Sequence, residues 1–120
     1  MIDDFFTYDK VNSELKYVFN DSNYSITKAN LVHAIFIPDY KLIIVTTEKD
    51  NNEYIYGYSV FGKNLFKQPA PDHYKLWYLE KDLKIAFTEK DEYAEKSGRS
   101  GWWFKINPTN GELTKDCWAY

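Results

Sequence analysis

The feature of this sequence that most restricts its fold is an internal repeat. The tetrapeptide Thr47-Glu48-Lys49-Asp50 recurs as Thr88-Glu89-Lys90-Asp91, 41 residues further along the chain. At the same offset the apolar residues that precede the two tetrapeptides also align: Ile35-Phe36-Ile37 with Leu76-Trp77-Tyr78, and Leu42, Ile44 and Val45 with Leu83, Ile85 and Ala86. The repeat predicts two similar units, at approximately 31–68 and 73–115, within a single β domain that spans residues 1–120.

Both units consist of short runs rich in Tyr, Phe, Ile, Val and Thr, which are typical of half-buried β-strands. Aromatic residues make up 19% of the chain, a content that excludes disorder as a description of most of it. Turn residues separate the runs, as at Gly62-Lys63-Asn64. The pattern predicts strands at Leu15–Phe19, Tyr24–Lys28, Leu31–Ile37, Leu42–Thr47, Tyr54–Val60, Leu65–Lys67, Tyr74–Leu79, Leu83–Thr88, Trp102–Ile106 and Leu113–Cys117. Only Phe5–Glu14 and Asp91–Lys96 could hold a helical turn, and neither has a clear 3.6-residue periodicity with capping residues.

Short strands with short antiparallel connections predict an all-β fold with two blade-like antiparallel sheets. Four strands with a period of roughly 40–45 residues resemble a blade of a β-propeller. Two such units, with part of a third in residues 5–28, fall short of the roughly four to eight blades of a closed propeller. We therefore expect the sheets to pack as a sandwich, a partial barrel or a partial propeller.

The charge balance restricts the expected partners. Lys and Arg total 15 and Asp and Glu total 18, which gives a net charge of −3. Nucleic-acid-binding surfaces normally carry a basic excess, so nucleic acid is not an expected partner. No apolar run approaches the ~20 residues that span a bilayer, and Met1-Ile2-Asp3-Asp4 is unlike a signal peptide. We expect a cytoplasmic protein without a membrane partner.

Groups that could support catalysis or metal binding are few. His33 lies in an apolar run and His73 follows Pro71-Asp72, which is not a metal-binding spacing. Cys117 is the only cysteine, and beside Trp118 it is expected to be a small packed hydrophobe. Paired acids such as Glu80 and Asp82 stand in lysine-containing turns that are typical of solvated surfaces. The sequence therefore predicts no catalytic residues, no metal site and no cofactor.

The aromatic strands leave a choice between packing and binding. Tyr54, Tyr56 and Tyr58 alternate along one strand and therefore share one of its faces. Such a face is either a stacking platform for sugars or bases or, more commonly, a layer of rings packed inward. Trp102 and Trp103 are expected to point to opposite faces, so that one is in the core and the other is a candidate exposed anchor.

Acidic residues gather in equivalent loops of the two units. If the units pack side by side, these loops emerge at the same edge and form a negative patch beside aromatic rings. Such a patch suits a basic protein, because complementary potentials speed encounter and aromatic rings anchor the contact; a pair of plain solvated loops is the alternative. The predicted partner-binding residues are Glu48, Asp50, Glu53, Tyr54, Glu89, Asp91, Glu92, Tyr93 and Glu95.

A short, acidic, β-rich domain without catalytic motifs is similar to the immunity proteins of bacterial polymorphic and contact-dependent toxin systems. The resemblance implies a non-catalytic module that binds and occludes a cognate toxin domain, frequently a basic nuclease, as a monomer or a small homo-oligomer. Two alternatives stay open. One is a structural β-repeat unit that homo-oligomerises, and the other is a small glycan- or ligand-binding β domain.

Overall fold

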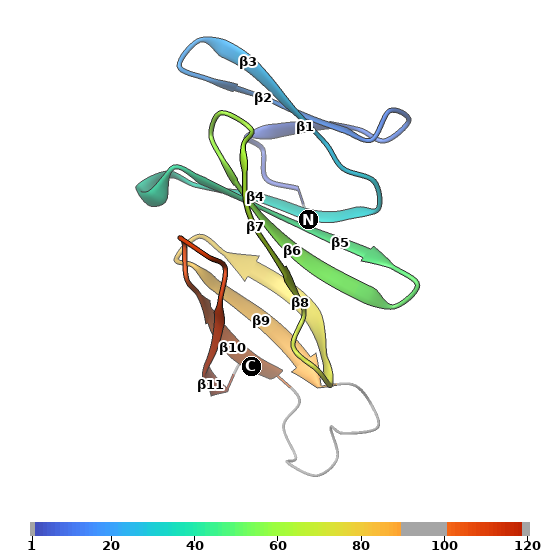
Figure 1. Cartoon of the computed structure of the whole chain (residues 1–120), viewed down its shortest axis with the longest axis vertical. Coiled ribbons are helices and arrows are strands. Elements are labelled where there is room, and N and C mark those ends of the chain that lie inside the picture. Colours follow the sequence, from blue (N-terminus) through green and yellow to red (C-terminus); the bar gives the residue numbers. More distant parts are fainter. Residues whose placement is uncertain (1, 90–100, 119–120) are drawn as a thin grey trace.

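The fold is a stack of three antiparallel sheets along the long axis of the molecule (Figure 1). The computed structural model describes residues 2–89 and 101–118, and within them eleven strands are joined as three meanders. The prediction of an all-β fold is confirmed. The sheets do not close into a barrel, in agreement with an open sandwich or partial propeller.

The first sheet contains β1 (Phe6–Asp9), β2 (Glu14–Phe19) and β3 (Ser22–Thr27). The second sheet contains β4 (Leu31–Ile37), β5 (Leu42–Lys49), β6 (Asn52–Ser59) and β7 (Asn64–Pro69), with a short 3-10 turn η1 (Pro38–Tyr40) between β4 and β5. The third sheet contains β8 (Tyr74–Glu80), β9 (Lys84–Glu89), β10 (Gly101–Ile106) and β11 (Leu113–Trp118).

The strand order shows how the three sheets correspond. In the second and third sheets the four strands pair in chain order, and the first strands, β4 and β8, lie close to each other. The chain passes from β3 into β4 just as it passes from β7 into β8. We infer that β1 to β3 correspond to the second, third and fourth strands of the other sheets, and that the first sheet lacks a counterpart of β4.

The first sheet begins with a strand that the sequence pattern did not predict. β1 lies within Phe5–Glu14, so this segment, which could have held a helical turn, contains a strand instead. Phe6 and Tyr8 pack inward, and Thr7 between them is exposed, but four residues are too few for this alternation to be recognised in sequence. The side chain of Asp9 then accepts hydrogen bonds from the N–H groups of Val11 and Asn12, which makes the turn into β2. Asp91–Lys96, the other segment that could hold a helical turn, lies outside the described residues.

The middle position of the second sheet explains the apolar run in β5. Leu42 and Ile44 face the third sheet, whereas Ile43 and Val45 face the first sheet. All four side chains are at most 2% exposed, because both faces of the strand are covered. Two separate cores result, one on each side of the second sheet.

The N-terminal segment ties the second sheet to the third. Ile2 forms a parallel bridge with Ala34 of β4. The carboxylate of Asp3 accepts hydrogen bonds from the N–H groups of Phe5 and Phe36 and forms an ion pair with Lys81 of the β8–β9 turn at 3.2 Å. Burial acts to raise the pKa of Asp3, but these hydrogen bonds and the Lys81 ammonium outweigh it and the pKa is lowered.

A buried tyrosine links the first sheet to the second. The hydroxyl of Tyr17, on β2, donates a hydrogen bond of 2.9 Å to the carbonyl oxygen of Val60, which follows β6. Tyr17 is 4% exposed, and burial raises its pKa to about 12. The hydroxyl therefore stays protonated and keeps its role as donor.

Replacing Tyr17 by phenylalanine is expected to lower the free energy of unfolding by about 1–2 kcal/mol, because the buried Val60 carbonyl loses its partner while the ring is kept. Urea unfolding of Tyr17→Phe and of the half-buried Tyr24→Phe as a control measures the difference. Equal, negligible losses in both variants contradict a role for this hydrogen bond in docking the first sheet.

Candidate partner-binding surface

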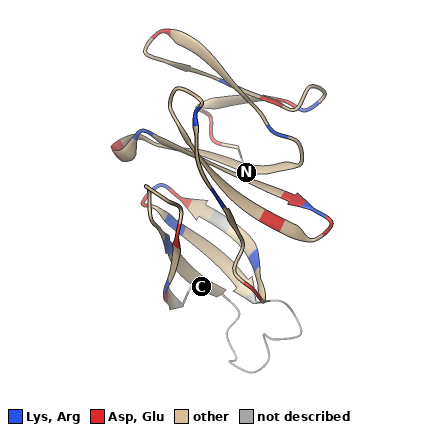
Figure 2. Cartoon of the chain, viewed as in Figure 1, with Lys and Arg blue, Asp and Glu red and all other residues tan. Residues whose placement is uncertain are grey.

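Four of the predicted partner-binding residues lie at the β5–β6 hairpin. Figure 2 shows acidic residues gathered at this end of the second sheet. Asp50 and Asn51 form the two-residue turn, with φ of 53° and 66°; positive φ at both positions is the geometry of a type I′ turn, which Asn and Asp tolerate. Asp50 is exposed, whereas Glu48, Glu53 and Tyr54 are half-buried.

Glu48 and Glu53 are directly opposite each other in the β5–β6 pair. Side chains at such positions leave the same face with Cβ atoms about 4.5–5.5 Å apart, and like charges there are destabilising. Within residues 2–89 and 101–118, no ion pair joins Glu48 or Asp50 to a lysine. Lys49 lies between Glu48 and Asp50 in the sequence, so residues 48–54 of the hairpin carry three carboxylates and one ammonium group.

Glu53 also has a structural role that its sequence context does not reveal. Its Oε1 atom accepts a hydrogen bond of 2.8 Å from the backbone N–H of Leu76, on β8. The N–H of Ala70 donates to the carbonyl of the same residue. Glu53 thus fixes the hairpin of the second sheet against the start of the third.

A polar cleft of about 180 Å³ lies between this hairpin and the connection from β7 to β8. Glu53 and Tyr54 line it from one side, and Asp72, His73 and Tyr74 from the other. Asp72 is exposed and was not among the predicted residues. The available signal was Pro69-Ala70-Pro71, because two prolines stiffen a connection and hold the following carboxylate in place.

The second group of predicted residues is only partly described. Glu89 ends β9 and is paired with Tyr74 of β8, so the backbone there adjoins the polar cleft. Each copy of the repeated tetrapeptide begins at the end of a strand, β5 or β9. The turn after β5 lines this cleft, and the end of β9 pairs with Tyr74, which also lines it. Asp91, Glu92, Tyr93 and Glu95 lie outside the described residues.

The tyrosine rings on one face of β6, at Tyr54, Tyr56 and Tyr58, are packed and covered rather than open to a ligand. Tyr58 is 6% exposed, and Tyr56 packs against the core beneath the first sheet. Lys28 Nζ lies 3.7 Å from the centroid of the Tyr56 ring, and Lys67 Nζ lies 4.5 Å from that of Tyr54. Since lysine ammonium groups occupy these ring faces, cation–π contacts within the chain take the place that a sugar would need.

The two neighbouring tryptophans of β10 point to opposite faces, as predicted from strand alternation. Trp102 packs against the core between the second and third sheets, with Lys115 Nζ 3.6 Å from its ring centroid. Trp103 is half-buried and lies between two residues that face this core, Trp102 and Phe104. Trp103 therefore belongs to the outer face of the third sheet.

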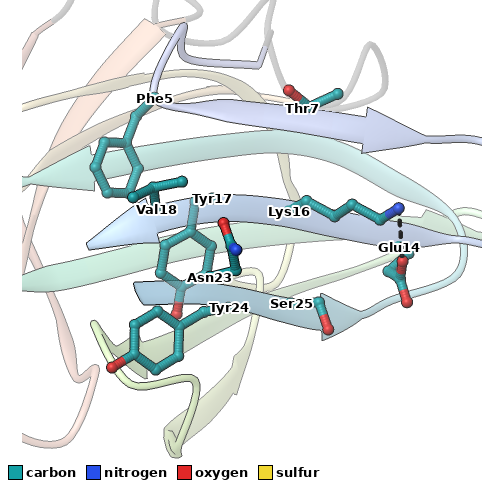
Figure 3. Close-up of a pocket in the computed structure, with 9 residues that line it drawn as sticks. All are labelled: Phe5, Thr7, Glu14, Lys16, Tyr17, Val18, Asn23, Tyr24 and Ser25. Atoms are coloured by element: carbon teal, nitrogen blue, oxygen red, sulfur yellow. Dashed lines mark ion pairs between the residues drawn. The ribbon is translucent and has the colours of Figure 1, made fainter. Parts of the chain in front are cut away.

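A shallow groove of about 480 Å³ lies over the first sheet (Figure 3). Its polar lining includes an ion pair of 3.2 Å between Glu14 and Lys16. Val18, in the same strand, is 56% exposed. The residues that line the groove are Phe5, Thr7, Glu14, Lys16, Tyr17, Val18, Asn23, Tyr24 and Ser25.

His33 and Cys117 are two further titratable residues that the structure describes. His33 is buried, and burial lowers its pKa to about 4. Cys117 is exposed, so its expected role as a packed hydrophobe is wrong; it lies on β11, at the edge of the third sheet. Among the described residues, no group of three or more His, Cys, Asp or Glu side chains is placed to hold a metal ion.

Comparisons with known proteins add no relative. No family model, curated protein or solved structure matches the chain. In the part of the chain that the structure describes, no helix has the length and apolar character needed to cross a membrane.

Proposed function

We propose that this chain is a non-catalytic protein-binding module whose acidic end binds a basic protein. The acidic end comprises Glu48, Asp50, Glu53, Tyr54 and Asp72. The observation that carries the proposal is the pairing of Glu48 directly opposite Glu53, beside the polar cleft. A lysine or arginine of a partner placed between these carboxylates relieves their repulsion and gains charge-assisted hydrogen bonds.

The class of partner that fits best is a toxin domain with a basic active site. A negative, partly rigid surface attracts such a domain and excludes its polyanionic substrate. The short chain and net charge of −3 agree with the immunity-protein profile. In this proposal the chain acts by occlusion, in the cytoplasm, and needs no cofactor.

The direct experiment mixes the purified protein with the basic toxin domain encoded by the adjacent gene. We expect a stoichiometric complex and loss of the toxin's nuclease activity, both weakened by salt because screening reduces the attraction between opposite charges. Full toxin activity in the presence of excess protein overturns the proposal.

Replacing Glu48 by glutamine is expected to have opposite effects on stability and on binding. Removing the like-charge pair raises the free energy of unfolding by about 0.2–1 kcal/mol, while loss of one carboxylate weakens toxin binding about five- to tenfold. Urea unfolding and calorimetric titration measure the two effects. A plain solvated loop predicts no change in affinity.

The matched control for this variant is Asp39→Asn. Asp39 is an exposed carboxylate in η1, at the opposite end of β5 from the hairpin. Asp39→Asn removes one negative charge from the protein, as Glu48→Gln does, so it measures the effect of the net charge alone on binding. Equal weakening by both variants shows that the hairpin is not the binding site.

A further inference from the structure

The two outer faces of the stack lie at the first and third sheets. The second sheet is covered on both sides, whereas the first and third sheets each have one face that no described sheet covers. In the third sheet, β8 has a bulge between Leu76 and Tyr78. The bulge allows Leu76 and Leu79, three residues apart, both to reach the core, and it turns Trp77 to the outer face, where it is 42% exposed.

The outer face of the third sheet has an apolar centre, and its described charged residues include one more base than acid. Ala86 is fully buried in this face and is paired with Trp103. Lys84 and Lys105 both approach Asp116, at 4.0 and 3.8 Å. By strand alternation the charged residues of this face are Lys75, Lys84, Lys105, Glu80 and Asp116, three bases against two acids among the residues described.

The outer face of the first sheet has the opposite character. It bears the groove of about 480 Å³, and it exposes Val18. By alternation its charged residues are Asp9, Glu14 and Lys16, two acids against one base. Among the described residues, the two end faces therefore carry net charges of opposite sign.

We propose that a second copy of this chain covers both faces. The third sheet of each copy packs on the first sheet of the other, so the same contact occurs twice about a two-fold axis. Three sheets from each copy then make a ring of six, within the range of about four to eight sheets at which stacked antiparallel sheets close. A heterologous contact that did not close would extend into a filament.

The area that the proposed interface buries favours a closed dimer with two contacts over a dimer with a single contact. Three strands about 4.8 Å apart and six residues long at about 3.4 Å per residue present roughly 300 Å². One contact buries two such faces, roughly 600 Å², which is below the ~1,200 Å² of the smallest stable interfaces. Two contacts bury roughly 1,200 Å², so closure is what makes the assembly stable.

Light scattering coupled to size-exclusion chromatography tests this pairing. The full chain at micromolar concentration is expected to have twice its monomer mass of 14.3 kDa. Trp77→Glu and Val18→Glu each place an unpaired charge in one of the two faces, and each is expected to give a monomer with an unchanged circular dichroism spectrum. Val11→Glu is the matched control, because Val11 is 93% exposed in the β1–β2 turn, and it is expected to remain dimeric.

Three results overturn the pairing. A wild-type monomer at this concentration shows that the faces do not associate. A dimer that Trp77→Glu disrupts but Val18→Glu leaves intact shows that two third sheets pack on each other. Assemblies that grow with concentration show an open chain rather than a ring. None of these results bears on toxin binding at the acidic end.

Discussion

Replacing Phe66 by alanine is expected to lower the free energy of unfolding by about 3–5 kcal/mol, the largest effect of any substitution considered. Phe66, on β7, is 7% exposed and belongs to the core between the second and third sheets. Its ring lies against Gly57 of β6 on one side and Gly111 of the β10–β11 turn on the other, so close that a Cβ at either glycine overlaps it. Alanine leaves this slot empty and removes the ring contact between β7 and the turn, so that the hydrogen bond from Gln68 to the Asn110 carbonyl remains between them.

Urea unfolding followed by circular dichroism measures this loss. Leu65→Ala is the control, because Leu65 is the neighbouring residue on β7 and is 43% exposed; it is expected to change stability by less than about 1 kcal/mol. Gly57→Ala tests the same slot from the opposite direction, since the added methyl group must displace the ring. If Phe66→Ala lowers the free energy of unfolding by less than about 1.5 kcal/mol, the contact of the Phe66 ring with the two glycines is not the main connection between these sheets.

Lowering the pH from 6.5 to 4 is expected to destabilise the protein through His33. Burial lowers the pKa of His33 from 6.5 to about 4, so the unfolded chain binds the proton more readily than the folded one across this window. Stability from this group is complete above pH 6.5 and is lost as the pH falls towards 4. The loss is roughly 2–3 kcal/mol, given about 1.4 kcal/mol for each pH unit and partial solvent screening.

The measurement is the free energy of unfolding at several pH values between 4 and 7. His33→Gln removes the titrating group, so its stability is expected to vary less with pH in this window, whatever its stability at pH 7. The backbone N–H of His33 donates to Thr46 Oγ1, a contact that glutamine at this position keeps. An identical pH slope in both proteins assigns the acid sensitivity to carboxylates such as Asp3.

Local patterns in the sequence were sufficient for most strands. The continuous apolar run of β5 and the alternation of Trp102 and Trp103 are set by residues a few positions apart. The turn at Asp50 and Asn51 likewise depends on two residues that tolerate positive φ. Such signals are strong because the backbone preference and the burial pattern agree over a short segment.

Other features escaped prediction because their signals are weak or interrupted. β1 is only four residues long, which is too short for a period-two pattern to stand out. The bulge in β8 breaks that pattern at Trp77, so alternation alone misplaces the residues on either side of it. The exposed position of Cys117 follows from the edge location of β11, and an edge strand is recognised only once the sheet order is known.

The candidate site was likewise predicted from the sequence only in part. The sequence identified an acidic hairpin with Glu48, Asp50, Glu53 and Tyr54. Only the register of β5 and β6 places Glu48 opposite Glu53, and only the packing of the second sheet on the third adds Asp72 and commits Glu53 to the N–H of Leu76. These relations join residues from separate strands, so no local pattern contains them.

By itself, the sequence determined the all-β class, because period-two alternation and turn chemistry are local. The tertiary structure decided that the described residues form three stacked sheets, that Lys28 and Lys67 cover the tyrosine rings, and that the first and third sheets each have one face that no described sheet covers. The physical reason is that apolar strands specify that a face must be buried, whereas packing between distant segments selects what covers it.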